Sequence, residues 1–220
     1  VKFIWTHDAF RVGEDGPTHE PVEQEAQIRL LEKLQNHKGQ DSLRVFRPAD
    51  AEETTVCWAM AMENMETPAA LIFSRQNIAE LPAGNDYEQA RKGAYVVAGS
   101  DDPFDVILLA SGSEVSTLEA GKELLEKDGV RCRVVSAPSE GLFRRQSKEY
   151  QESVLPTGSK IFGMTAGLPV TLEGLVGIGP NSRIFGMKSF GFSAPYKVLD
   201  EKLGFTAENV YKQVKDFLGK

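Results

Sequence analysis

The sequence is poor in cysteine and lacks long apolar runs. Its 220 residues include 2 cysteines, Cys57 and Cys132, which are too few for a disulfide framework or a cysteine-rich metal site. No apolar run approaches the roughly 20 residues that a membrane-spanning helix needs, and no signal-peptide pattern opens the chain. We therefore expect a cytoplasmic protein that does not enter a membrane and resides in a reducing compartment.

Positive charge is also scarce. The 25 lysines and arginines are outnumbered by 32 aspartates and glutamates, giving a net charge of −7. Because nucleic acids and anionic membranes are bound by basic surfaces, neither is an expected partner. A small basic pocket for a phosphorylated metabolite remains compatible with this balance. Hydrophobic residues at 41% and charged residues at 26% are typical of a folded globular chain.

Strand-like and helix-like segments alternate along the chain, which predicts an α/β fold with a largely parallel sheet. Strands are expected at residues 3–5, 44–46, 69–73, 94–98, 105–110, 131–136, 161–164 and 183–186. Helices are expected at 21–34, 51–64, 111–127 and 146–154, and in a closing segment capped by Thr206. The polar stretch 81–93 contains proline and glycine, so a domain boundary is expected near it.

Two helix starts carry a capping signature. Asp50 is followed by Glu53, and Ser111 is followed by Glu114, so each polar first residue has a glutamate three positions later. The second signature lies inside a βαβ unit of about thirty residues. Because it matches neither a dinucleotide fingerprint nor a Walker sequence, helix capping is the expected role of Ser111.

Polar side chains follow two of the predicted strands. His7 comes after the first strand and Arg75 after the third. If these strands are parallel neighbours, both side chains face one crevice at the carboxyl edge of the sheet, where ligands bind in open α/β folds. Arginine grips phosphate oxygens in a bidentate manner, and a turn between the two strands carries Asp15 and His19. These residues therefore predict a pocket for a phosphorylated, hydroxylated substrate.

A purely structural role explains the same residues equally well from spacing alone. A histidine at a strand end commonly makes a local hydrogen bond, and Gly-Pro turns that carry aspartate are usually only turns. His37, in a polar loop, is expected to be a solvated surface residue.

Five segments nevertheless resemble the transketolase family, in order and in approximate spacing. They are WTHD at 5–8, VGEDGPTHEPVE at 12–23, FRPAD at 46–50, SRQN at 74–77 and ASGSEV at 110–115. The ending GFSAP at 191–195 is similar too. The resemblance covers the chain from end to end. It implies a partial parallel-sheet domain at 1–92, the second half of a pyrimidine-binding domain. A Rossmann-like mixed-sheet C-terminal domain would follow at 93–220.

The resemblance also implies a reaction, the reversible transfer of a two-carbon ketol group between sugar phosphates of the pentose phosphate pathway. Thiamine diphosphate with a divalent metal such as magnesium would be the cofactor of a homodimeric parent enzyme. By position, His7 and Arg75 would bind the substrate phosphate or nearby hydroxyls. Asp15 would recognise a donor hydroxyl, and His19 would lie near the reacting thiazolium of the cofactor and assist proton transfer.

In this family the diphosphate and the metal are bound by an N-terminal domain that these residues do not include. We therefore expect a C-terminal fragment that binds no cofactor or metal by itself and is inactive alone. Two alternatives remain open. One is a natural subunit of a split thiamine-diphosphate enzyme, and the other is a non-catalytic interaction module that retains the fold.

Overall fold

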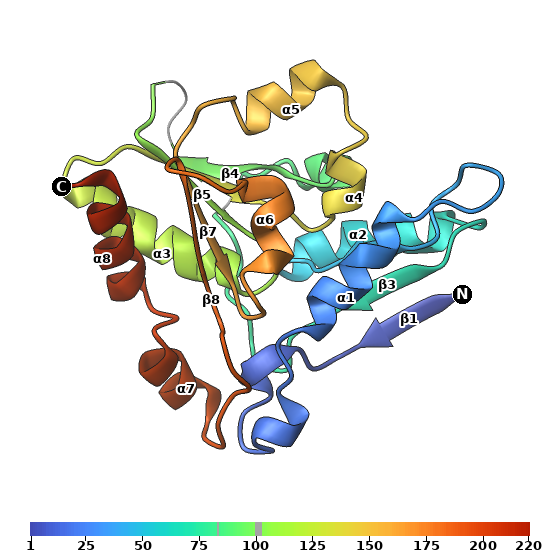
Figure 1. The fold of residues 1–220 in the computed structure, drawn as a ribbon, viewed down its shortest axis with the longest axis horizontal. Coiled ribbons are helices and arrows are strands. Elements are labelled where there is room, and N and C mark those ends of the chain that lie inside the picture. The colour runs from blue at the N-terminus through green and yellow to red at the C-terminus, as the bar shows by residue number, and fades with distance from the viewer. Residues whose placement is uncertain (83, 100–102) are drawn as a thin grey trace.

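Two β-sheets and the helices around them make up the computed structural model, which describes residues 1–82, 84–99 and 103–220 (Figure 1). The first sheet contains β1 (Lys2–Trp5), β2 (Arg44–Phe46) and β3 (Ala69–Ile72). The second contains β4 (Tyr95–Gly99), β5 (Val106–Ala110), β6 (Cys132–Ser136), β7 (Ile161–Thr165) and β8 (Ser182–Gly186). The predicted α/β fold, with a parallel sheet followed by a mixed sheet, is confirmed.

The first sheet has the strand order β1-β3-β2, and all of its strands are parallel. β3 is buried along its whole length, whereas β1 forms an edge and exposes Phe3, Ile4 and Trp5. In the register, Trp5 pairs with Ile72, so β1 and β3 end at the same level. The segments that carry His7 and Arg75 therefore leave the sheet side by side, because their strands are parallel neighbours.

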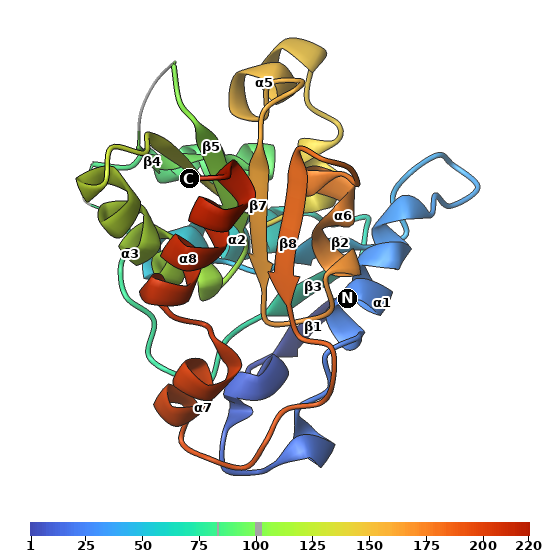
Figure 2. The same cartoon turned by 60° about the vertical axis from the view of Figure 1, so that its left-hand side comes forward.

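The second sheet has the order β4-β6-β5-β7-β8, in which β4 is antiparallel to β6 and the other pairs are parallel. Alternate residues of β5 point to opposite faces, as the two-residue period of a strand requires. Leu108 joins the apolar cluster that contains residues of α3 and α8, and Leu109 joins the cluster that contains residues of α4 to α6. Both faces of this sheet are thus covered by helices (Figure 2).

The helices are shorter and more numerous than the sequence predicts. They are α1 (Gln24–Leu30), α2 (Ala51–Glu63), α3 (Glu114–Lys127), α4 (Glu140–Phe143), α5 (Lys148–Val154), α6 (Val170–Val176), α7 (Tyr196–Leu203) and α8 (Ala207–Leu218). Short 3-10 helices are η1 (Ala9–Val12), η2 (Pro17–His19), η3 (Leu31–Lys33) and η4 (Tyr87–Lys92). The helix predicted at 21–34 is divided into α1 and η3. The sequence analysis missed α4, α6 and α7, which are too short to display a clear helical period.

Two predicted caps are present. The Asp50 side chain accepts a hydrogen bond of 2.8 Å from the Glu53 backbone N–H, and α2 follows directly. The Thr206 hydroxyl accepts one from the Asn209 backbone N–H at the start of α8.

The cap predicted at Ser111 is wrong. Helix α3 begins only at Glu114, and Ser111 lies outside it. The Ser111 hydroxyl accepts a hydrogen bond from Arg29, and its carbonyl accepts one from Arg47. Tertiary contacts with distant arginines therefore use the groups that the local pattern assigned to the helix terminus.

The two sheets share one buried core. A single apolar cluster includes Leu71 of β3, Leu108 of β5 and Val210 of α8. Cys57 and Cys132, both free, are buried in the same cluster. Within the described residues, none of the helices combines the length and the apolar character needed to traverse a bilayer.

Candidate functional site

A pocket of about 270 Å³ opens where β1 ends. Residues of β1 and of the loop after it, of α1, of the end of β3 and of the segment after β7 form its walls. They are Trp5, His7, Asp8, Ala9, Thr18, His19, Pro21, Val22, Gln24, Glu25, Ile28, Ile72 and Gly167. The pocket thus combines two imidazoles with a wall of apolar side chains, which is a usual composition for a small-molecule site.

The two imidazoles are held in a similar way. Nδ1 of His7 lies 2.7 Å from the hydroxyl of Thr6, and Nδ1 of His19 lies 3.1 Å from that of Thr18. Both histidine side chains are exposed in this chain. An imidazole oriented through one ring nitrogen can present the other nitrogen to a ligand, as a donor or as an acceptor.

Arg75 and Asp15, the other two predicted site residues, lie outside the residues described as lining this pocket. The Arg75 guanidinium donates to the backbone carbonyl of Val12 and lies 3.6 Å from the Glu14 carboxylate. Asp15 is exposed in the turn that follows. The structure therefore places His7, Asp15 and His19 in one loop, residues 6–20, and Arg75 in contact with that loop. Of these four residues, the two histidines line the pocket.

Glycine permits the sharp turns of this loop. Gly13 and Gly16 have φ values of +92° and +83°, which a side chain would strain. The buried Glu20 carboxylate accepts a hydrogen bond of 2.9 Å from the Gly13 backbone N–H. Burial raises the pKa of Glu20, although hydrogen bonds from the Gly13 and Phe192 backbone oppose the rise. The hydrogen bond between Gly13 and Glu20 therefore closes the loop at its base.

The loop after β8 holds this turn from outside. The Ser193 hydroxyl donates a hydrogen bond of 2.7 Å to the Glu14 carbonyl, and Gly191 packs against the Glu20 carboxylate so closely that a Cβ there would lie 1.9 Å from its oxygen. Residues more than 170 positions apart in the sequence therefore pack together around the turn at residues 13–20. The GFSAP segment at 191–195 fits the loop because it supplies a glycine at that contact.

Beneath the pocket lies a buried cluster of ion pairs that the sequence analysis did not identify. Arg47 is 1% exposed and lies 2.6 Å from both Asp8 and Glu114. Arg11 is 4% exposed, pairs with Glu114 and lies 2.7 Å from Asp200. Arg47 and Glu114 belong to the FRPAD and ASGSEV segments, so the resemblance pointed to these positions without indicating that they touch.

The charges in this cluster shift one another's pKa values. Burial by itself would raise the pKa of Glu114, but the guanidiniums of Arg47 and Arg11 outweigh it and hold the pKa below its usual value. Burial dominates at Asp8 and raises its pKa, despite the opposing effect of Arg47. A paired, hydrogen-bonded arrangement of this kind is what allows charge to be buried at all.

The described residues do not fit a metal-bound diphosphate. Among them, no group of three or more His, Cys, Asp and Glu side chains is placed to hold a metal ion. The pocket carboxylates Asp8 and Glu25 are already engaged by arginines. The pocket itself suits neutral or anionic hydroxylated groups that imidazoles can bind.

Two family models match the chain. Residues 1–80 match a model described as the transketolase pyrimidine-binding domain, and residues 93–206 match one described as the transketolase-like C-terminal domain. The transketolase of Staphylococcus epidermidis is 43% identical over 217 residues, which cover 97% of this chain and 31% of that protein. The chain therefore spans about a third of the length of such relatives.

Solved structures give the same result. Transketolase from Leishmania mexicana has a TM-score of 0.85 and 36% identity, covering 98% of this chain and 30% of its own. Transketolase from Pichia stipitis in complex with sedoheptulose 7-phosphate has a TM-score of 0.84 and 33% identity, with coverages of 98% and 30%. An inactive β4 tetramer of a split-gene transketolase shares the fold, with a TM-score of 0.68, 23% identity and coverages of 100% and 67%.

Proposed function

Because the chain belongs to the transketolase family, we propose that it forms the substrate-facing part of a thiamine-diphosphate-dependent transferase. The reaction is the transfer of a two-carbon ketol group from a ketose phosphate to an aldose phosphate, a step type of the pentose phosphate pathway. The observation that carries this proposal is the convergence of His7 and His19 on one pocket, in a chain whose two halves match the two family models.

In this proposal the substrate spans from the pocket to the outer side of the loop. His7 and Arg75 bind the phosphate or the hydroxyls beside it, since an imidazole and a guanidinium both donate hydrogen bonds to phosphate oxygens. Asp15 accepts a hydrogen bond from a donor hydroxyl. His19, the last residue of η2, lines the same pocket and moves a proton near the reacting carbon.

Thiamine diphosphate, when bound, supplies the electron sink for the carbon–carbon bond that breaks and forms. Polypeptide outside this chain would hold its diphosphate and a magnesium ion, since the described residues form no cradle for them. The active assembly would be a cytoplasmic homodimer of the complete enzyme. The chain by itself would bind no cofactor and would be inactive.

We also propose a division into a domain at 1–92 and a domain at 93–220. The two sheets, whose strands lie within residues 2–72 and 95–186, support the division. So do the separate matches at 1–80 and 93–206. The first sheet then belongs to the pyrimidine-binding part, and its edge strand β1 exposes apolar side chains to a neighbour.

The test is a reconstitution assay. The chain is assayed with thiamine diphosphate, magnesium and a ketose–aldose phosphate pair, first alone and then mixed with a polypeptide carrying the remaining part of a transketolase. Activity is expected only in the mixture. Activity of the chain alone, or its absence from a mixture shown to form a complex, would contradict the proposal.

Variants then test the residues. His19→Ala is expected to reduce kcat by about 10²-fold or more, the range for a lost general acid or base. Arg75→Ala is expected to raise KM on the order of 10- to 100-fold, because charged hydrogen bonds to the substrate are lost. His37→Ala changes an exposed loop histidine far from the pocket and is the matched control, with no change expected.

A second arrangement is favoured by the shared fold with the split-gene β chain: this chain would be one of two separate polypeptides of a natural enzyme. It predicts a stable complex with a separately encoded cofactor-binding chain, measurable by co-purification. A non-catalytic interaction module, in contrast, would remain inactive in every mixture.

A further inference from the structure

The buried carboxylate of Glu114 connects the second sheet to the turn that carries His7. Glu114 is the first residue of α3 and is fully buried. Its Oε1 accepts hydrogen bonds from Arg11 and from the Ser113 hydroxyl, and its Oε2 accepts one of 2.6 Å from Arg47. The Ala166 backbone N–H, beyond β7, lies 3.2 Å from the same Oε2. One side chain is therefore anchored to both β5–α3 and β7.

The two arginines reach from this carboxylate to opposite ends of one short segment. Arg47 places Nε 2.7 Å and Nη2 2.6 Å from Oδ2 of Asp8, the residue directly after His7. Arg11, three residues further along, is itself part of η1. Residues 8 and 11 are thus both linked to the Glu114 carboxylate, Asp8 through Arg47 and Arg11 directly.

The backbone between these two ties is strained. Ala9 has a φ of +47° and is the one non-glycine residue, among those described, in the left-handed region. Such a conformation is unfavourable for alanine and persists only where the surroundings impose it. Ala9 also lines the pocket beside His7. The ion pairs at Asp8 and Arg11 lie on either side of this residue.

Glycine at position 112 makes the contact possible. A Cβ on Gly112, whose φ is +64°, would lie 2.6 Å from Cζ of Arg47. The Gly112 backbone N–H donates a hydrogen bond of 2.9 Å to the Arg47 carbonyl, and the Arg47 N–H donates one of 2.9 Å to the Pro138 carbonyl. Arg47 is thus seated against the second sheet by its backbone as well as by its guanidinium.

We infer that Glu114 is a positioning residue for the substrate pocket. Through Arg47 and Asp8 on one side and Arg11 on the other, its carboxylate holds residues 8–11 in the strained turn and so sets the place of the His7 imidazole. The inference rests on the proposed function only for the meaning of His7 as a substrate ligand. It gives the C-terminal part of the chain a defined task in a pocket lined mainly by the N-terminal part.

The test needs no activity and uses the full 220-residue chain with isotope-labelled histidine. The sequence has 3 histidines, so His7, His19 and His37 give three sets of ring signals, and His37 is an internal reference. Glu114→Gln keeps the volume and removes the charge. It is expected to shift the His7 ring signals, to leave those of His37 in place, and to speed amide exchange at residues 10–13 about tenfold or more.

The matched control is Glu53→Gln, which alters another fully buried carboxylate that bridges the two halves. Glu53 accepts hydrogen bonds from the Ser136 hydroxyl at 2.7 Å and from the Ala49 backbone N–H, and neither donor belongs to residues 8–11. It is expected to leave the His7 signals and the exchange at 10–13 unchanged. Equal changes in both variants would show general loosening and would overturn the inference.

If Glu114→Gln fails to fold, Asp8→Asn takes its place. This variant removes only the ion pair between Asp8 and Arg47 and leaves the Glu114 pairs with Arg47 and Arg11 intact. It is expected to shift the His7 signals while the His19 and His37 signals remain. Unchanged His7 signals in every folded variant would refute the inference. A reconstituted mixture that lacks transketolase activity would refute the proposed function and would leave this result standing.

Discussion

The ionisation of Glu53 is expected to make the stability of this protein fall as the pH rises. Glu53 is fully buried near the start of α2, where its carboxylate accepts hydrogen bonds from the Ser136 hydroxyl at 2.7 Å and the Ala49 backbone N–H at 2.5 Å. Burial raises its pKa from an ordinary 4.5 to about 7, and the hydrogen bonds only partly oppose the rise. The folded state therefore prefers the neutral carboxyl.

The sign follows from the linkage between protonation and folding. A raised folded-state pKa contributes stability that is fully present below the unfolded pKa and is lost as the pH rises through the folded pKa. A shift from 4.5 to about 7 corresponds to roughly 3 kcal/mol at about 1.4 kcal/mol per pKa unit. Most of this loss falls between pH 4.5 and 7.

The variant Glu53→Gln cannot ionise and should lack this dependence. Free energies of unfolding are measured by urea titration, with tryptophan fluorescence as the signal, at intervals between pH 4 and 8. The difference, variant minus wild type, is expected to rise by about 3 kcal/mol over this range. Using the difference cancels the contributions of titrating groups that do not interact with Glu53.

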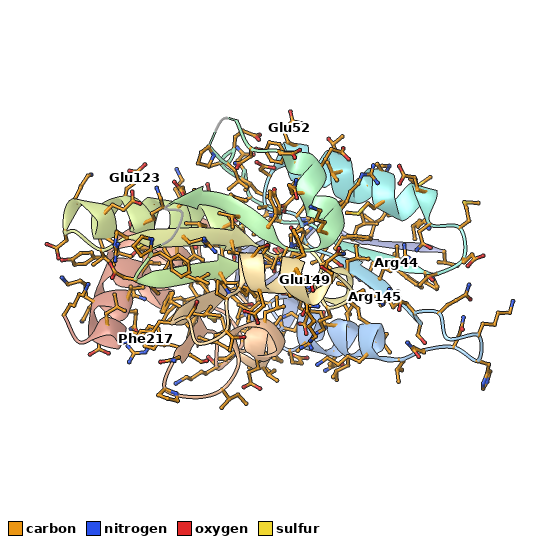
Figure 3. All side chains as sticks on the ribbon, turned by 90° about the horizontal axis from the view of Figure 1, so that it is seen from above. Arg44, Glu52, Glu123, Arg145, Glu149 and Phe217 are labelled. Carbon is orange, nitrogen blue, oxygen red and sulfur yellow. The ribbon has the colours of Figure 1, made fainter. Side chains whose placement is uncertain are left out.

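Glu52→Gln is the matched control. Glu52 is the neighbouring residue in the first turn of α2, and its side chain points outward from the protein (Figure 3). Its difference from wild type should stay flat across the same pH range. A flat difference for Glu53→Gln as well would refute the argument that the carboxyl buried between α2 and β6 resists ionisation.

Three further measurements test the packing. Gly121→Ala should destabilise the chain by about 1–3 kcal/mol in urea unfolding, because its Cβ would lie 2.4 Å from Cγ1 of Val210 on α8; a gain in stability would contradict this packing. Thr206→Ala should cost about 1 kcal/mol by loss of the α8 cap, and an unchanged thermal midpoint would argue against that cap. Limited proteolysis with mass spectrometry should leave residues 93–220 as the resistant core, because the three-stranded sheet has an exposed edge; a resistant 1–92 would refute this.

The local features of the fold follow from the sequence by itself. Asp50 and Thr206 stand directly before helical segments, and their caps involve residues only three positions away. Within the part of the chain that the structure describes, the eight strands β1 to β8 were all predicted, since each contains apolar residues and is bounded by polar residues, glycine or proline. The resemblance of the loop at 6–20 to transketolases could be recognised because the segment at 12–23 is unbroken in the sequence. Patterns of this kind depend on neighbours that the chain itself provides.

The buried ion pairs beneath the pocket were decided only by the tertiary structure. Glu114 meets Arg11 across 103 positions and Arg47 across 67, and no local spacing encodes either pair. Arg47, together with Arg29, also binds the Ser111 groups that the local pattern assigned to a helix cap. A charged group can be buried at tolerable cost only where it is paired and hydrogen-bonded, and the partners of Glu114 come from distant parts of the chain. Which charges arrive depends on how the two sheets dock, and that docking is a property of the whole fold.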